Sequence, residues 1–340
     1  MSDIKESMKN KRLQRAVPCL VGVDFSSTAT KVVRLKKGKD GLVLTGIDLL
    51  PAIDFGRPPR RVELPRNMMA NYGCLTYTGA SSVVRMLNVS LPKGQEELPD
   101  SKLQELLNVG EDYRVGAMLV KRGQGRQDSS LMAAAIPEKD VGFLLSMFPG
   151  GPPAPTSVEV SGLSFVQAFL HARGEECRDE AVCLIEAGDS VCHFAFLNKG
   201  SAVLVGKFDF GGSALRAKVA QDLGVDDELA GTILRDQSIN ISSAMTDVMA
   251  PLLKQLSISK DFIERHQSCH ISKVYVSGGL SLIPHWSEII EQMLHVEVFP
   301  WSPFENIKFD QPNIVPKDLA AQATRFAAAV GAVIGGFEES

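Results

Sequence analysis

Two stretches of this chain carry the residue types that bind phosphate and a divalent cation. In each, an apolar run ends in a carboxylate, Asp24 in the first and Glu186 in the second. The turn residues that follow are Ser26, Ser27 and Thr28 in the first stretch, and Gly188, Asp189 and Ser190 in the second. A carboxylate at a strand end can hold a hydrated cation, and small turn residues offer hydroxyl and backbone N–H donors to an oxyanion. Either stretch alone is typical of an ordinary hairpin, whereas two that face each other could hold a phosphate chain from both sides.

The two stretches belong to a longer repeat. With Asp24 aligned on Glu186, the apolar runs that follow also align, and the Lys-Gly pair at 37–38 falls on the pair at 199–200 without a gap. Each copy therefore predicts a strand, a tight turn, a second strand, a Lys-Gly turn and a third strand. We expect Asp24 and Glu186 to lie opposite each other across one crevice. Lys31, in the second strand of the first copy, could reach a phosphate or, as we favour, lie on a solvated face.

Two pairs of glycines add to this pattern. Gly278 and Gly279 follow the β-rich run 273–276 and precede Ser281 and a helical pattern over 285–294. Paired glycines between a strand and a helix let the main chain approach a flat ligand or a phosphate closely, and a helix N-terminus favours negative charge. Gly211 and Gly212 similarly open a predicted helix over 214–223. All four glycines are candidates for a nucleotide site.

Composition limits the remaining possibilities. The chain has 340 residues, 44% of them hydrophobic and 22% charged, with a formal net charge of −4. These values predict two or three folded units and do not favour nucleic acid as a partner. No apolar run is long enough to span a bilayer, and 1–16 lacks the apolar core of a secretory signal. Six scattered cysteines predict reduced thiols, so we expect a cytoplasmic protein.

A Gly- and Pro-rich stretch at 149–155 predicts a linker. Before it, the pattern predicts strands over 82–91, 113–121 and 129–135 and helices over 101–107 and 138–147, which together indicate a small α+β insert. The pair His266 and His270 has the spacing of metal ligands on a helix, but with no third ligand evident we expect exposed polar residues there.

The residues that carry these patterns resemble the PilM family of type IV pilus assembly proteins, within the actin-like ATPase superfamily and similar to FtsA. The segments that carry the resemblance are 21–33, 211–212 with its helix, 276–284, 296–307 and 326–334. The resemblance implies an α/β, actin-like (ribonuclease H-like) fold of two lobes with an inserted subdomain called 1C. The implied divisions are a basic tail at 1–17, lobe 1 at 18–73, 156–175 and 320–340, the insert at 74–155, and lobe 2 at 176–319.

The resemblance also implies ATP and Mg²⁺ between the lobes. The implied nucleotide-binding residues are Asp24, Ser26, Ser27, Thr28, Lys31, Glu186, Gly188, Asp189, Ser190, Gly211, Gly212, Gly278, Gly279 and Ser281, with Asp24 and Glu186 reaching Mg²⁺ through water. The implied partner is the cytosolic N-terminal peptide of a PilN-like membrane protein, docked between the first lobe and the insert. Other pilus assembly components, a homo-oligomer and a place at the inner face of the inner membrane are further implications.

Several residues depart from the family pattern. Ser26 stands where the family usually has glycine, Glu186 where it has aspartate, and Asp189 adds a negative charge beside the expected γ-phosphate. Cys192 and His193 replace hydroxyl residues. We therefore expect a scaffold that binds ATP weakly or conditionally. An active ATPase or phosphotransferase and a nucleotide-free pseudo-ATPase scaffold are the alternatives.

Overall fold

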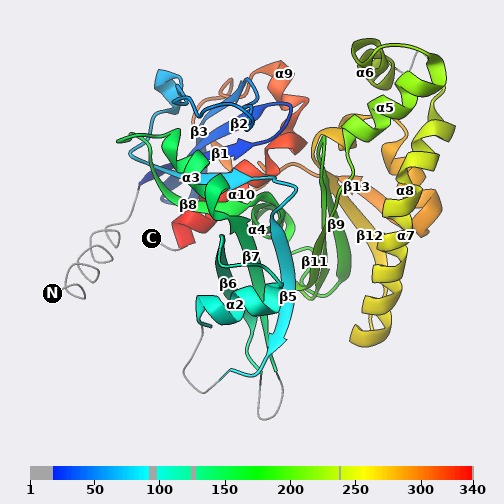
Figure 1. Cartoon of the computed structure of the whole chain (residues 1–340), viewed down its shortest axis with the longest axis horizontal. Helices are drawn as coiled ribbons and strands as arrows, with labels where there is room; N and C mark the ends of the chain where they lie inside the picture. The colour runs from blue at the N-terminus through cyan, green and yellow to red at the C-terminus, as the bar shows by residue number, and fades with distance from the viewer. Residues whose placement is uncertain (1–17, 92–97, 124–127, 237–238, 339–340) are drawn as a thin grey trace.

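The computed structural model describes residues 18–91, 98–123, 128–236 and 239–338, which form two α/β lobes and a smaller sheet (Figure 1). The expected basic tail, 1–17, lies outside the described residues.

Lobe 1 is built on a six-stranded sheet in the order β14-β3-β2-β1-β4-β8. Its strands are β1 (Cys19–Phe25), β2 (Thr30–Gly38), β3 (Gly41–Leu50), β4 (Tyr72–Tyr77), β8 (Ala154–Val160) and β14 (Lys308–Phe309). The central strand β1 pairs antiparallel with β2 and parallel with β4. Because both faces of β1 are covered, it is apolar almost throughout and ends in Asp24 and Phe25.

Lobe 2 repeats this arrangement in a five-stranded sheet of order β11-β10-β9-β12-β13. Its strands are β9 (Ala181–Ala187), β10 (Cys192–Asn198), β11 (Ser201–Phe208), β12 (Ile271–Ser277) and β13 (Glu297–Pro300). The hairpins β9–β11 correspond to β1–β3, and β12 and β13 occupy the places of β4 and β8. The duplication predicted for three strands is confirmed, and the sheet order extends it to five.

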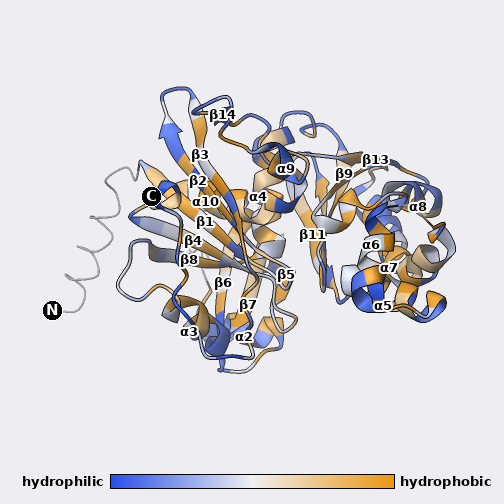
Figure 2. Cartoon of the chain, turned by 90° about the horizontal axis from the view of Figure 1, so that it is seen from above, coloured by the Kyte–Doolittle hydropathy of each residue, from blue (hydrophilic) through white to orange (hydrophobic). Residues whose placement is uncertain are grey.

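Helices cover both sheets and join the lobes. Those of the lobes are α4 (Ser161–Arg173), α5 (Gly212–Leu223), α6 (Asp227–Asp236), α7 (Ser242–Gln267), α8 (Trp286–Leu294), α9 (Lys317–Ala320) and α10 (Ala327–Glu338), with short 3₁₀ turns η1 (Arg66–Met68), η2 (Gly279–Leu282) and η3 (Ala323–Phe326). Phe169 of α4 packs on Tyr275 of β12 and on Trp301, with ring centroids 4.9 and 5.2 Å apart. Helix α4 is therefore part of one continuous hydrophobic core that both lobes share. Figure 2 shows apolar residues concentrated along the inner strands and α10.

The smaller sheet has the order β5-β7-β6. Its elements are β5 (Val83–Val89), α2 (Asp100–Leu107), β6 (Tyr113–Lys121), β7 (Ser129–Pro137) and α3 (Glu138–Ser146), so the five elements predicted for the insert are confirmed. The expected start of the insert at residue 74 falls inside β4, which hydrogen-bonds to β1 and β8. Likewise β14 lies within the segment expected for lobe 2 but pairs with β3. We propose that the insert spans 78–153 and that lobe 1 includes β4, β8 and β14.

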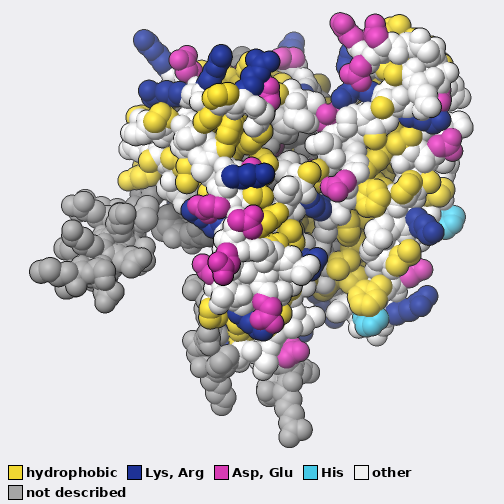
Figure 3. Space-filling view, in the orientation of Figure 1, with side chains coloured by type: hydrophobic (Ala, Val, Ile, Leu, Met, Phe, Trp, Pro, Cys, Tyr) yellow, Lys and Arg dark blue, Asp and Glu magenta, His cyan; other side chains and the backbone are white. Residues whose placement is uncertain are grey.

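The surface carries charges of both signs. Figure 3 shows basic and acidic side chains interspersed on the face in view, with hydrophobic side chains gathered over α7, where Ile258 and Phe262 are exposed. Within the described ranges, no helix combines the length and the apolar character that crossing a membrane requires.

Candidate functional site

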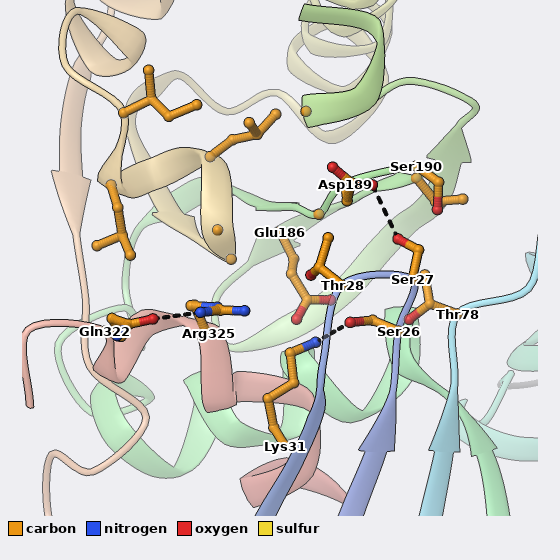
Figure 4. A pocket seen from close by; sticks show the side chains of 18 of the residues that line it. Ser26, Ser27, Thr28, Lys31, Thr78, Glu186, Asp189, Ser190, Gln322 and Arg325 are labelled. Carbon is orange, nitrogen blue, oxygen red and sulfur yellow. Dashed lines mark hydrogen bonds between the residues drawn. The ribbon is translucent and has the colours of Figure 1, made fainter. Parts of the chain in front are cut away.

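A cleft of about 550 Å³ lies between the two lobes, at the carboxyl ends of β1 and β9. The turns that follow these strands form its two walls, and Figure 4 shows their side chains converging from opposite sides. Asp24 and Glu186 both line this cleft. The expectation that the repeat would bring the two carboxylates to one crevice is therefore confirmed.

Most of the residues singled out from the sequence meet in this cleft. Those that line it are Asp24, Ser26, Ser27, Thr28, Lys31, Glu186, Gly188, Asp189, Ser190, Gly212, Gly278 and Gly279. Gly211 and Ser281 are not among the described lining residues. A Cβ on Gly211 would lie 2.3 Å from the Asp189 carbonyl, so Gly211 lets α5 pack on the second turn. Ser281 Oγ donates a hydrogen bond to the Gly278 carbonyl at 2.7 Å and lies 3.1 Å from Thr324 Oγ1, contacts that anchor the η2 turn.

The two hairpins place equivalent side chains at equivalent points. Asp24 lies opposite Lys31 in the β1–β2 ladder, and Glu186 lies opposite His193 in the β9–β10 ladder. The neighbouring parallel strand adds a hydroxyl residue in each lobe, Thr76 opposite Asp24 and Ser277 opposite Glu186. Each carboxylate thus sits between a basic side chain and a hydroxyl side chain that its own sheet supplies.

Both oxygens of the first carboxylate, Asp24, accept hydrogen bonds. Asp24, 3% exposed, accepts hydrogen bonds from Lys31 Nζ and Thr76 Oγ1, each at 2.8 Å. Lys31 Nζ also donates to Ser26 Oγ at 2.7 Å. The solvated position favoured for Lys31 is wrong, since the side chain is 8% exposed and its ladder partner Asp24 draws it inward. This pairing and the added hydrogen bonds offset part of the cost of burying the two charges.

The second carboxylate has weaker partners. Glu186 Oε2 lies 3.6 Å from His193 Nδ1, and burial raises the pKa of Glu186, with the nearby His193 opposing that rise. His193 Nε2 is buried without a hydrogen-bond partner, and the Ser277 hydroxyl is likewise unpaired within the described chain. Glu186 is therefore closer to its neutral form than an exposed glutamate at the same pH.

Asp189 links the two walls. Its Oδ2 accepts a hydrogen bond from Ser27 Oγ of the opposite turn at 3.2 Å, and its Oδ1 lies 2.6 Å from Arg216 Nη1. The hydrogen bond from Arg216 to Asp189 raises the pKa of Arg216 and is the largest influence on that pKa. Arg216 comes from α5, one turn past the Gly211–Gly212 pair. The Ser27–Asp189 hydrogen bond joins the two lobes directly across the cleft.

The cleft contains donors suited to an anion. The backbone N–H groups of Ser27, Thr28, Asp189 and Ser190 have no protein acceptor among the described residues. The carboxylates that line the cleft are those of Asp24, Glu186 and Asp189. The cationic side chains that line it are those of Lys31, Arg216, Arg235 and Arg325, and His193 lies there as well. Cations therefore outnumber carboxylates, and exposed N–H groups on both turns complete a site that fits phosphate oxygens.

Direct metal ligation has less support than phosphate binding. No group of three or more His, Cys, Asp or Glu side chains within the described chain is placed to hold a metal ion. The sequence candidates His266 and His270 are both exposed, and His270 Nδ1 lies 3.0 Å from Glu264 Oε1. A divalent cation in the cleft would therefore depend on water and on the phosphates of a ligand in addition to Asp24 and Glu186.

Sequence reasoning missed several cleft residues. Arg325, from η3 near the C-terminus, donates to Gln322 and has no carboxylate within ion-pair distance among the described residues. Burial lowers its pKa, and Figure 4 shows its guanidinium hydrogen-bonded to Gln322 on one side and extending towards the middle of the cleft on the other. At the other end, Leu234, Leu282 and Ile283 provide apolar side chains. Arg325 and Leu234 lie on separate helical segments, η3 and α6, with no motif around them, whereas Leu282 and Ile283 follow the Gly278–Gly279 pair closely.

Two similar α/β lobes with a cleft between their first hairpins define an actin-like fold. A solved structure described as a PilM–PilN type IV pilus biogenesis complex superposes with a TM-score of 0.76 at 17% identity, covering 94% of this chain and 98% of that one. The family model for the type IV pilus assembly protein PilM matches residues 158–337, more than half of the chain. The chain therefore belongs to the PilM family.

Other solved structures are more distant. The ethanolamine utilization protein EutJ from Carboxydothermus hydrogenoformans matches with a TM-score of 0.46 at 15% identity, over 93% of this chain and 89% of that one. MreB 5 of Spiroplasma citri, solved with AMPPNP, matches with a TM-score of 0.45 at 10% identity, over 93% and 95%. No curated protein matches the chain by sequence.

Proposed function

We propose that the chain is a type IV pilus assembly scaffold that binds a nucleotide such as ATP, with Mg²⁺, between its lobes and docks the N-terminal peptide of a PilN-like membrane protein. The observation that carries the nucleotide proposal is the meeting of two equivalent turns in one cleft. Their free N–H groups, with Lys31, Arg216 and Arg325, supply donors and positive charge for a phosphate chain.

The residues that line the cleft also indicate how a bound nucleotide would be oriented. The apolar side chains of Leu234, Leu282 and Ile283 lie beside η2 and α6 and suit the base, while both turns suit the phosphates. A cleft of about 550 Å³ is within the range of small-molecule sites. Asp24 and Glu186 would hold a hydrated Mg²⁺, which would neutralise phosphate charge. The chain's own residues bind the phosphates and bring the lobes together.

Titration calorimetry with Mg²⁺-nucleotide tests this proposal. We expect one nucleotide per chain, and we expect Gly279→Val to weaken binding at least about tenfold, or 1.4 kcal/mol. Gly279 lines the cleft and a Cβ there meets nothing within 4 Å, so the added side chain would fill ligand space without a clash in the free protein. The matched control is Gly142→Ala, at an exposed glycine of α3 that also meets nothing within 4 Å. Absence of saturable binding to the unaltered protein, or equal binding by both variants, would contradict the proposal.

We further propose that the PilN-like peptide docks on the face of the insert sheet opposite α2. Three methionines lie in register across this sheet, with Met86 and Met118 each opposite Met132. Met132 belongs to the hydrophobic core that includes lobe 1, and Met86 packs against that core, whereas Met118 is 52% exposed. Flexible thioether side chains adapt to an apolar peptide, so the exposed Met118, on the edge strand β6, suits the docking of a short segment beside lobe 1. Recruitment by this peptide would place the protein at the cytoplasmic face of the inner membrane.

Fluorescence anisotropy with a labelled N-terminal peptide of the PilN-like protein of the same organism tests the docking surface. We expect saturable binding that Met118→Lys weakens at least about tenfold, since an exposed apolar anchor is replaced by a charge. The matched control is Ile258→Lys, because Ile258 is 55% exposed but lies on α7 of lobe 2. Equal loss in both variants, or no loss in Met118→Lys, would count against this surface.

A further inference from the structure

A carboxylate occupies the gap between the two turns of the cleft. Asp189 and Ser27 are equivalent positions of the repeat, 162 residues apart, and their side chains meet at 3.2 Å (Figure 4). The Asp189 side chain is 14% exposed, and Arg216 holds its second oxygen at 2.6 Å. An acidic side chain thus bridges the two turns and holds Arg216 from the second lobe.

The backbone around Asp189 is fixed. Its carbonyl oxygen accepts hydrogen bonds from Ser213 N at 2.9 Å and from Ser213 Oγ at 2.8 Å. Gly211 packs so closely against this residue that a Cβ there would lie 2.3 Å from the Asp189 carbonyl. Because the turn is held in this way, the carboxylate can leave the gap only by rotation of its side chain, which also requires separation from Arg216.

Resting on the nucleotide-binding function proposed above, we infer that Asp189 makes the cleft selective for nucleoside diphosphates over nucleoside triphosphates. With the base at the apolar end of the cleft, the phosphate farthest from it is the one that reaches between the two turns. A terminal phosphoryl group there meets a like charge at short range and competes for Arg216, both of which oppose binding. A diphosphate is shorter and leaves the Asp189 contacts intact.

The test compares the dissociation constants of ADP and ATP, each with Mg²⁺, for the unaltered protein and for Asp189→Asn. We expect the unaltered protein to bind ADP at least tenfold more tightly than ATP. Asp189→Asn keeps the shape of the side chain and removes its charge, so it should tighten ATP at least tenfold and change ADP less than threefold. Asp227→Asn is the control, because Asp227 also contacts Arg216, at 3.3 Å, but is largely exposed. It should leave the ratio of the two constants unchanged.

The outcomes separate the two proposals. Equal affinity of the unaltered protein for ADP and ATP, or an equal effect of Asp189→Asn on both, overturns the selectivity while leaving nucleotide binding in place. Failure of both nucleotides to bind overturns the nucleotide function and the selectivity together. Melting curves of each variant show whether it is folded, and the ratio measured on the unaltered protein needs no variant at all.

Discussion

Asp24 and Glu186 are equivalent carboxylates in very different surroundings. Asp24 is 2.8 Å from both Lys31 Nζ and Thr76 Oγ1. Among the described residues, Glu186 has only His193 Nδ1 as a partner, at 3.6 Å, and the equivalent hydroxyl of Ser277 is unpaired. Burial accordingly raises the pKa of Glu186. At the residue scale, one carboxylate has close basic and hydroxyl partners, and the other, with weaker partners, costs stability when ionised.

Glu186→Gln should therefore stabilise the protein at neutral and alkaline pH. With a pKa raised in the folded state, the native protein binds more protons than the unfolded chain, so its stability falls as the pH rises through that pKa. The gain from the neutral glutamine should be full above the raised pKa and vanish below the ordinary glutamate pKa. Melting temperatures of both proteins between pH 4 and pH 8 measure it; a loss of stability at pH 8, or a difference independent of pH, would contradict it.

Asp24→Asn should have the opposite effect. It leaves the Lys31 ammonium buried without its counter-charge, which costs about 3–5 kcal/mol. Chemical denaturation at pH 7 measures the change. A loss below about 1 kcal/mol would show that Lys31 finds another partner or reaches solvent.

At the element scale, the strand-and-turn repeat and the insert were predictable because each rests on a local pattern of apolar alternation and glycine. The strand order of both sheets also repeats, yet β12 and β13 share no readable motif with β4 and β8, so sequence reasoning stopped at the hairpins. Cleft residues on helices were missed for a similar reason. Arg216 and Arg325 are ordinary helix residues in sequence, and only tertiary packing brings them to the cleft.

The packing of α10 on α4 gives a prediction at this scale. A Cβ on Gly331 would lie 1.7 Å from the Ser164 carbonyl oxygen, so the two helices touch through their backbones. Gly331→Ala should destabilise the protein by about 3 kcal/mol or more, because the helices must move apart. Gly142→Ala, in the open face of α3, should instead stabilise it by up to about 1 kcal/mol through helix propensity. Denaturant unfolding of both variants measures these changes; similar values would contradict the close helix contact.

At the scale of the whole molecule, the insert contacts both lobes. Strand β5 of the insert lies beside β11 of lobe 2, and Lys207 Nζ of β11 donates a hydrogen bond to the Ala80 carbonyl. A nucleotide that changes the closure of the lobes would therefore also shift the insert relative to lobe 1. The proposed peptide surface and the cleft would then be coupled through this contact.

Nucleotide and peptide should consequently affect each other's binding. We expect saturating ADP to change the dissociation constant of the peptide several-fold, and the peptide to change that of ADP by the same factor, as linkage requires. Lys207→Ala should reduce this factor, since it removes the Lys207–Ala80 hydrogen bond, one of the contacts between the insert and lobe 2. Anisotropy and calorimetry measure the two constants; a factor of one in the unaltered protein would mean that the sites are independent.

The central claim is that the two equivalent turns hold one nucleotide between them. Electron density of crystals grown with Mg²⁺-ADP tests this most directly. We predict phosphate density within hydrogen-bonding distance of N–H groups from both turns, Ser27–Thr28 and Gly188–Ser190, and base density beside Leu234 and Ile283. Density on one turn alone, elsewhere on the surface, or absent at saturating nucleotide would contradict it.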